Sequence, residues 1–301
     1  MRGRPLSFAL LFVALLIWGF AYVVTRSGLS TVPPMLFALL RYCVASLLLV
    51  PLALVRGGLG RLPRPVPWVT LVLMSLTGVA LYYVLFNLAI SFTTAAQTAL
   101  LQSSFPAVVA VMAVLWLHER IARRRIIGIV LAIAGVVLII AQAAPDTSAR
   151  DPLLGNALGV ASVLSWGAYT SLAKRIADAD PIAVTAVVSL IGTVLLIPAA
   201  LIENADVSLA SIPADGWGAI IYLGALASAV SYLLYTRALR DIDASLVGTF
   251  VNLSPVIGVI SGVLVLGEPI TTIAIVGGVM VLAGVWISSL PSRESSARTA
   301  R

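Results

Sequence analysis

Long apolar runs, separated by short connections that carry Pro, Gly or charge, dominate the chain. A transmembrane helix needs roughly 20 mostly apolar residues, and only helices or closed barrels satisfy their backbone groups in lipid. The apolar-polar alternation of a membrane-spanning strand is absent from these runs. The pattern therefore predicts an all-α membrane protein with ten transmembrane helices, at Leu6–Thr25, Pro34–Leu54, Trp68–Asn87, Ala95–Leu117, Ile126–Ala144, Leu154–Ala173, Ile182–Ile202, Trp217–Ala238, Ser245–Leu266 and Thr272–Leu290.

The basic residues fall mainly in every second connection. If the N-terminus lies in the cytoplasm and the runs alternate in direction, 16 of the 19 Lys and Arg residues lie on the cytoplasmic side. Arg26 and Arg150 fall on the outer side, and Arg41 lies within a predicted helix. Lys and Arg in short loops favour the cytoplasmic side of a membrane, so both termini are expected there.

The composition excludes a soluble domain. Apolar residues make up 60% of the chain and charged residues 10%, with a mean hydropathy of +1.09, against about 45–50% and 25% in soluble domains. The net charge of +7 does not indicate a nucleic-acid partner, because the basic residues punctuate apolar runs and form no patch interleaved with aromatic residues. With a single cysteine, Cys43, and a single histidine, His118, we expect no metal site and no cofactor.

The two halves of the chain resemble each other at an offset of 148 or 149 residues. Each half, 1–147 and 148–301, holds five predicted helices, so the second half would enter the membrane from the opposite side. Such inverted repeats are frequent in secondary transporters and place the substrate site between the halves, near the bilayer midplane. The first run follows a basic start, as in a signal peptide, but its recurrence inside the chain favours a retained helix. The recurring residues include Trp18 and Trp166, Gly19 and Gly167, Tyr83 and Tyr232, Pro106 and Pro255, and Glu119 and Glu268.

These paired motifs resemble a known family. The WG dipeptide near the start of each half, Leu40–Arg41 in the second helix, the two prolines, and LHE or LGE before a glycine-spaced helix are similar to the ten-helix EamA-type exporters of the drug/metabolite transporter superfamily. The resemblance covers roughly residues 6–290, and within the superfamily it is closest to the YddG-like exporters of aromatic and other amino acids. It implies efflux of small metabolites across the bacterial inner membrane.

Ionisable residues inside a membrane are costly and usually functional. All twelve Asp and Glu residues lie in connections or tails. A proton or sodium relay through a buried carboxylate therefore has no evident carrier, and we expect either a facilitator or coupling of another kind. Arg41 is the one charge well inside a predicted helix. Its role could be a clamp for a substrate carboxylate, a gate, or a structural cation that contacts helix carbonyls or reaches outward.

Polar and aromatic side chains in six of the helices are the candidates for a substrate pathway, because polar groups in lipid are expected to face the bundle interior. Trp and Tyr at helix ends are typical of the membrane interface, but several here lie well inside their runs. A cavity of aromatic residues with a few amides and hydroxyls would suit a neutral, partly apolar substrate. The candidates are Trp18, Tyr22, Arg41, Tyr83, Asn87, Thr98, Gln102, Ser103, Trp166, Tyr169, Tyr232, Tyr235, Thr249 and Asn252.

Two further pairs have candidate structural roles. Pro106 and Pro255 would free a carbonyl and bend their helices, either as a gating hinge or as a static kink. Glu119 and Glu268 each precede a predicted helix, whose exposed N–H groups and positive dipole end favour an acid. We therefore interpret His118–Glu119 as a helix junction and not as a proton or metal site.

The sequence favours a transporter that exports small metabolites, with large neutral or aromatic amino acids as the expected substrates and alternating access as the mechanism. The alternatives within the superfamily are a multidrug carrier and a carrier of nucleotide sugars or lipid-linked substrates; several intramembrane cations would favour an anionic sugar nucleotide, and only Arg41 is present. A membrane-embedded enzyme would need a nucleophile and base, or a metal cluster, at depth.

Small residues on one face of 126–144 and of 272–290 allow close helix contact, either within one chain or between two chains in a homodimer.

Overall fold

The computed structural model describes residues 4–108, 111, 123–141, 150–176, 178–203, 208–238, 250–251 and 253–289. Every regular element in these ranges is helical, as the apolar runs predict. Two continuous helical segments, residues 68–92 and 214–238, each contain a central π-helical stretch, η2 (Leu76–Ala80) and η5 (Tyr222–Val230) respectively. The elements are α1 (Arg4–Gly28), α2 (Pro34–Val55), η1 (Gly58–Arg61), α3 (Trp68–Ser75), η2 (Leu76–Ala80), α4 (Leu81–Phe92), α5 (Ala95–Gln102), α7 (Arg123–Ala141), α8 (Pro152–Ala173), η3 (Lys174–Ile176), α9 (Pro181–Glu203), η4 (Leu209–Ser211), α10 (Ala214–Ile221), η5 (Tyr222–Val230), α11 (Ser231–Ala238), α13 (Leu253–Leu266) and α14 (Thr272–Ser289).

Within the described ranges, five helices are long and apolar enough to cross a membrane: Pro5–Gly28, Pro34–Val55, Trp68–Phe92, Pro181–Glu203 and Ala214–Tyr235. Three shorter apolar helices accompany them, at Ile126–Ile139, Leu253–Leu266 and Thr272–Ile287. Large apolar side chains are exposed along the outer faces of α2, α7, α9 and α14. An exposed apolar surface of this extent is what a helix bundle surrounded by lipid requires.

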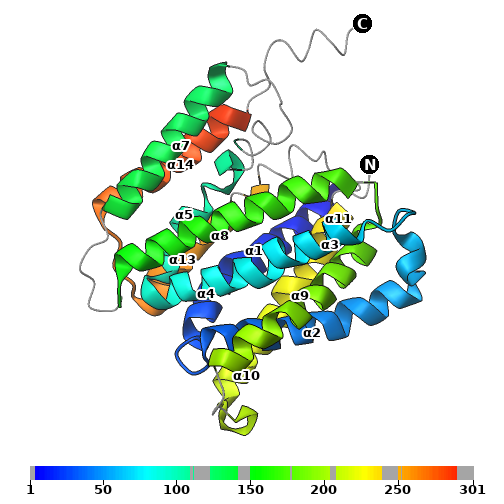
Figure 1. Cartoon of the computed structure of the whole chain (residues 1–301). Coiled ribbons are helices and arrows are strands. Elements are labelled where there is room, and N and C mark those ends of the chain that lie inside the picture. The colour runs from blue at the N-terminus through cyan, green and yellow to red at the C-terminus, as the bar shows by residue number, and fades with distance from the viewer. Residues whose placement is uncertain are drawn as a thin grey trace, which may run out of the picture.

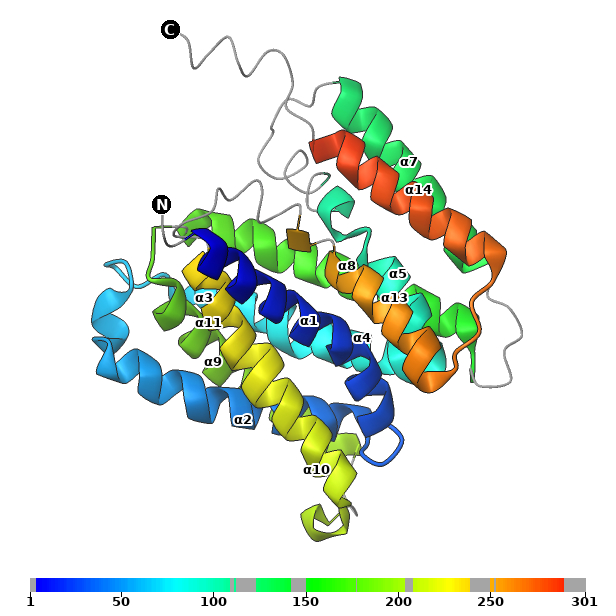
Figure 2. The same cartoon turned by 180° about the vertical axis from the view of Figure 1, so that it is seen from behind.

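The helices pack in pairs that follow the internal repeat. In Figures 1 and 2, α7 and α14 lie side by side at one edge of the bundle, and α2 lies beside α9 in the main body. The α5 and α13 helices also pack together, α1 contacts α11 and α13, and α8 contacts α4 and α5. At the repeat offset, α1 corresponds to α8, α2 to α9, and α7 to α14. The contact of α1 with α11 therefore has its counterpart in the contact of α8 with α4, and the contact of α2 with η5 has its counterpart in the contact of α9 with η2.

The glycines of α7 and α14 serve a contact within one chain. A Cβ atom at Gly135 would lie 2.5 Å from the Gly277 carbonyl oxygen, and one at Gly284 would lie 2.4 Å from the Gly128 carbonyl oxygen. The two backbones approach so closely that only hydrogen fits at these positions. The small-residue face therefore joins two helices of the same chain and gives no support to a homodimer.

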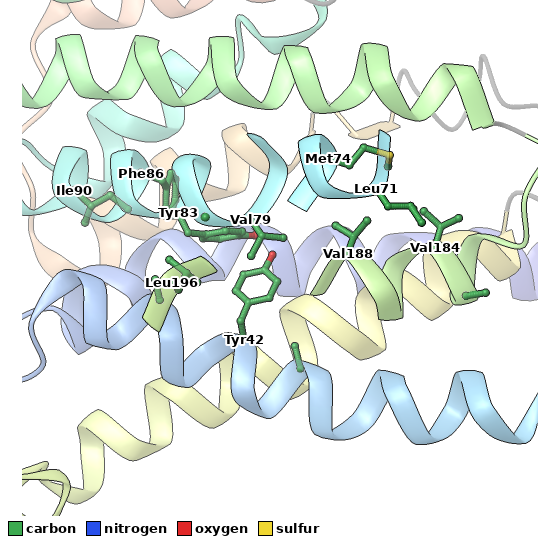
Figure 3. Packing of buried hydrophobic residues seen from close by; sticks show 14 of the residues in the cluster. Tyr42, Leu71, Met74, Val79, Tyr83, Phe86, Ile90, Val184, Val188 and Leu196 are labelled. Carbon is green, nitrogen blue, oxygen red and sulfur yellow. The ribbon is translucent and has the colours of Figure 1, made fainter. Parts of the chain in front are cut away.

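The largest buried cluster lies where α2, α4 and α9 meet. Figure 3 shows Tyr42 of α2 facing Tyr83 of α4, with Val79 beside them. Val184, Val188 and Leu196 of α9 belong to the same cluster. Of the candidate pathway residues, Tyr22 and Tyr83 belong to this cluster, and Tyr169 packs against it.

Candidate functional site

Arg41 is buried between three helical elements. Its side chain is 5% exposed. Its Nε donates to Ser228 Oγ of η5 at 3.0 Å, and its Nη2 donates to the Tyr83 hydroxyl of α4 at 3.2 Å. The guanidinium carbon also lies 4.3 Å from the centre of the Tyr83 ring, which is a cation–π distance. Both hydrogen-bond partners are neutral, so neither balances the positive charge.

A set of seven ring side chains, which we call the aromatic cluster, surrounds this position and extends across the bundle. Tyr82 links α4 to α8 through Trp166, at 4.8 Å between ring centres, and the same Trp166 ring lies 4.8 Å from Tyr169. Rings at these spacings gain stability beyond the burial of their area. The cluster therefore joins four helices into one apolar and aromatic lining. It comprises Tyr22, Tyr42, Tyr82, Tyr83, Phe86, Trp166 and Tyr169, and an eighth ring, that of Phe105, contacts Trp166 at 6.1 Å between ring centres.

Glycines let two of these rings approach neighbouring backbones. A Cβ atom at Gly78 of η2 would lie 2.4 Å from the Tyr169 ring, and one at Gly258 of α13 would lie 2.6 Å from the Tyr22 ring. Any larger residue would push these rings out of place. The local sequence of η2 and α13 therefore helps to position the aromatic cluster.

The two π-helical segments lie next to the cluster and are tied to neighbouring helices. A π-helix leaves the regular hydrogen-bond pattern, so some carbonyls need partners elsewhere. Ser165 of α8 donates to the Thr77 carbonyl of η2 at 2.7 Å. Trp18 of α1 donates from Nε1 to the Ala227 carbonyl of η5 at 2.9 Å. Because α1 corresponds to α8 at the repeat offset and η2 corresponds to part of η5, the two ties join corresponding elements, although Trp18 matches Trp166 and Ser165 matches Ile17.

Two other candidates connect helices. Trp18 also contacts Tyr235 of α11, with ring centres 5.5 Å apart. Asn87 is 1% exposed and donates its amide to the Pro34 carbonyl at 2.9 Å, while its Oδ1 has no hydrogen-bond partner among the described residues. Asn87 thus ties α4 to the start of α2. Tyr232 lies half-buried on α11.

Two of the three candidates at residues 98–103 have side chains engaged locally. The Thr98 hydroxyl donates to the Thr94 carbonyl, and the Ser103 hydroxyl donates to the Leu100 carbonyl, each within its own chain segment. Gln102 differs, because its amide reaches Ser162 Oγ of α8 at 2.8 Å. Of these three candidates, only Gln102 links the segment to another helix of the site.

The prolines occupy different local settings. The helix predicted at 95–117 is interrupted, because α5 ends at Gln102, Ser103 and Ser104 form a turn, and helical structure resumes at residues 105–108. Pro106 therefore lies in the first turn after a break. A first helical turn tolerates proline, since its N–H would be unpaired there in any case. Pro255 lies in α13, and residues 250 and 251 before it are also helical. The structure thus places Pro106 near the start of a helical segment, and the hinge or kink role of the two prolines stays a prediction.

The acid at 268 caps a helix, but not the one that follows it. Glu268 is 7% exposed and accepts hydrogen bonds from the Ala95 and Ala96 amides at 2.9 and 2.8 Å, at the start of α5. The following helix, α14, is capped instead by the Thr271 hydroxyl. The reason is that α5 and α13 are packed together, which brings the end of α13 to the start of α5. Glu119, Thr249 and Asn252 lie outside the described residues.

Several residues of the site were not among the candidates. Tyr42, Tyr82 and Phe86 belong to the aromatic cluster, and Ser165 binds the η2 carbonyl. The signal that could have found two of them is adjacency, because Tyr42 follows Arg41 and Tyr82 precedes Tyr83. Ser165 has no comparable signal.

A bundle of apolar helices around a buried cation and aromatic side chains defines a multi-pass membrane protein with a polar centre. The chain belongs to the EamA-like transporter family, whose model matches it twice, over residues 6–141 and 153–290. It is thus a transporter of the drug/metabolite transporter superfamily, as the paired motifs indicated.

Relatives in bacteria and archaea carry transporter names. The chain is 29% identical to an "Uncharacterized transporter" of Archaeoglobus fulgidus over 95% of this chain and 98% of that protein. It is 30% identical to a "Probable amino-acid metabolite efflux pump" of Salmonella typhimurium over 96% and 97% of the two chains. A solved crystal structure with 20% identity has the same fold, with a TM-score of 0.65 over 95% of this chain and 98% of that chain.

Proposed function

We propose that this transporter exports large neutral or aromatic amino acids from the cytoplasm by alternating access. The observation that carries the proposal is the aromatic cluster around Arg41, which combines a large apolar surface with one buried group that binds carboxylates. The Salmonella relative, named as an amino-acid metabolite efflux pump, supports the same substrate class. Pockets of mainly aromatic and apolar lining with few polar groups suit such molecules.

We further propose that residues 1–147 and 148–301 are two repeats inserted in opposite directions, with both termini in the cytoplasm of a bacterial inner membrane. The charge distribution supports this orientation, because 16 of the 19 basic residues then face the cytoplasm. The equivalent contacts of the two halves support a repeat. An interface between such halves is where alternating access would place the substrate.

We also propose that transport does not depend on a buried carboxylate. Glu203, the last residue of α9, and Glu268, which follows the end of α13 at Leu266, are both bound to helix N-termini. None of the twelve acids falls in the middle of an apolar run. A substrate gradient alone would then drive flux.

Counterflow in proteoliposomes tests the proposal. Vesicles are loaded with unlabelled phenylalanine, leucine or tryptophan, and uptake of labelled phenylalanine is followed at equal pH on both sides. Saturable uptake that these amino acids inhibit is expected. A cationic dye and a nucleotide sugar are the comparison substrates. If the dye or the nucleotide sugar inhibits uptake and the amino acids do not, amino-acid export is wrong. If uptake requires a pH gradient, the uncoupled mechanism is wrong.

A further inference from the structure

We infer that Arg41 is the anchor for the substrate's carboxylate, and that the substrate's ammonium group has no charged partner in the site. The transported class is then carboxylates with a large apolar or aromatic group, with or without an amino group. This inference rests on the proposed function and narrows it to one recognition chemistry.

The first step concerns the unbalanced charge. A buried cation is costly unless an anion or a set of hydrogen-bond acceptors compensates it. Arg41 is 5% exposed, and its partners in the described part of the chain are two neutral hydroxyls and one aromatic ring. An anionic ligand would supply the missing charge.

The second step concerns the donors that remain. A guanidinium group has five N–H donors in a planar fork that matches a carboxylate. The N–H of Nε donates to Ser228, and one N–H of Nη2 donates to Tyr83. The other N–H groups are available to a carboxylate. The Tyr83 hydroxyl and ring hold the guanidinium group from α4, so little ordering is needed when the ligand binds.

The third step concerns the backbone around Arg41. A Cβ atom at Gly224 would lie 2.6 Å from the Arg41 carbonyl oxygen, so η5 rests directly on α2. This contact sets the position of Ser228, one turn further along η5. Separation of η5 from α2 would open the guanidinium to a ligand, and alternating access provides such a movement.

The fourth step concerns the two ends of the substrate. Tyr42 lies against Tyr83 at 5.0 Å between ring centres, and Phe86 and Tyr22 continue the apolar surface. These rings suit an aromatic or large aliphatic group. In contrast, the described acids Glu203, Glu268 and Asp180 are bound to backbone amides of α2, α5 and α9. An ammonium group therefore meets no free carboxylate among them.

A purely structural cation in the same chain has a different environment. Arg26 of α1 donates from Nη1 to the Ile90 carbonyl, in the last turn of α4. A cation there stabilises the end of the helix and its dipole. Arg41 contacts side chains and no backbone carbonyl among the described residues. Arg26 is therefore the matched control for Arg41.

The test compares three probes that share one ring. Phenylalanine carries both charged groups, 3-phenylpropionate carries only the carboxylate, and phenethylamine carries only the ammonium. Inhibition of labelled phenylalanine counterflow is expected from phenylalanine and 3-phenylpropionate, with half-maximal concentrations within about tenfold of each other. Phenethylamine is expected to inhibit at least about tenfold more weakly. Equal inhibition by phenethylamine and 3-phenylpropionate would overturn the inference and leave amino-acid export intact.

Variants separate binding from folding. Arg41→Gln should raise the half-maximal concentration of both carboxylates by about tenfold or more, without lowering the melting temperature, since it removes an unbalanced buried charge. Arg41→Lys should recover part of the affinity. Arg26→Gln should lower the melting temperature and leave the affinity of the folded protein unchanged. If the Arg41→Gln protein is less stable but binds both carboxylates with unchanged affinity, Arg41 is a structural cation and the inference is wrong. If no large neutral amino acid supports counterflow in the wild-type protein, the proposed function itself is wrong.

Discussion

Helix N-termini that meet acids from the other half of the chain are a recurring feature at the residue scale. Glu203, at the end of α9, accepts hydrogen bonds from the Met35 and Leu36 amides at 2.6 and 3.2 Å. Glu268 serves the start of α5 in the same way. The first amides of a helix have no partner within the helix, and water is scarce in a membrane, so a side-chain carboxylate is an effective substitute.

Glu268→Gln should destabilise the protein. The amide keeps one acceptor oxygen but loses the negative charge, and its NH₂ group faces a backbone N–H. We expect a loss of about 1 kcal/mol in the free energy of unfolding, with little change in transport per folded molecule. Thermal unfolding in detergent measures this. Asp215→Asn, in the exposed first turn of α10, is the control and should have a smaller effect. Equal stability of the two variants would contradict the capping role.

Residue chemistry explains which parts of the site could be predicted. Arg41 is recognisable because it is the one charge well inside an apolar run, and Tyr83 because it recurs as Tyr232. The roles of Thr98 and Ser103 were not predictable in this way. A hydroxyl in a helix can donate to a carbonyl three or four residues earlier, and its proton is then not available to a ligand. The partner of Glu268 depends on which helices pack together, and spacing along one helix does not show this.

At the scale of elements, the two π-helical segments are the main departure from regular helices. Both occur at equivalent positions of the repeat, and in both a side chain from a neighbouring helix binds a carbonyl of the segment. The apolar pattern predicts where these helices run but not where their hydrogen bonds shift by one residue. Irregular turns of this kind often lie at functional sites, and here they lie beside Arg41 and Tyr169.

Removal of these two ties should loosen the π-helical segments. Trp18→Phe keeps an aromatic ring beside Tyr235 but leaves the Ala227 carbonyl without its donor, and Ser165→Ala does the same for Thr77. Each change should cost about 1 kcal/mol of stability and alter the rate of counterflow more than the half-maximal substrate concentration. Ser30→Ala, on an exposed turn, is the control. Unchanged stability and rate in both variants would show that the ties are dispensable.

At the scale of the whole molecule, the helical class and most helix positions follow from the apolar runs. For example, the predicted Pro34–Leu54 and Ile182–Ile202 correspond to α2 and α9 within one residue at each end. The reason is that a lipid environment leaves few structural choices for an apolar run of that length. The break after Gln102 was not predicted, because Ser103 and Ser104 do not interrupt the apolar pattern strongly.

The orientation of the molecule can be measured with single cysteines. In a Cys43→Ser background, Ser30→Cys lies on an exposed turn between α1 and α2, and Arg64→Cys lies in the exposed connection between α2 and α3. A membrane-impermeant maleimide added to intact spheroplasts should label Ser30→Cys and should label Arg64→Cys only after permeabilisation. The reverse pattern would place both termini outside and contradict the distribution of basic residues.

The capping of α2 and α5 by acids of the second half also has a consequence for biosynthesis. Glu203 lies 168 residues after Met35, and Glu268 lies 173 residues after Ala95. At about 5–20 residues per second, the ribosome delivers these carboxylates roughly 8–35 s after the amides that they serve. During that interval the starts of α2 and α5 depend on the insertion machinery or on water for their hydrogen bonds. A nascent chain that stops after the first repeat therefore keeps two uncapped helix ends at the membrane surface, where membrane quality-control proteases can distinguish it from the finished protein.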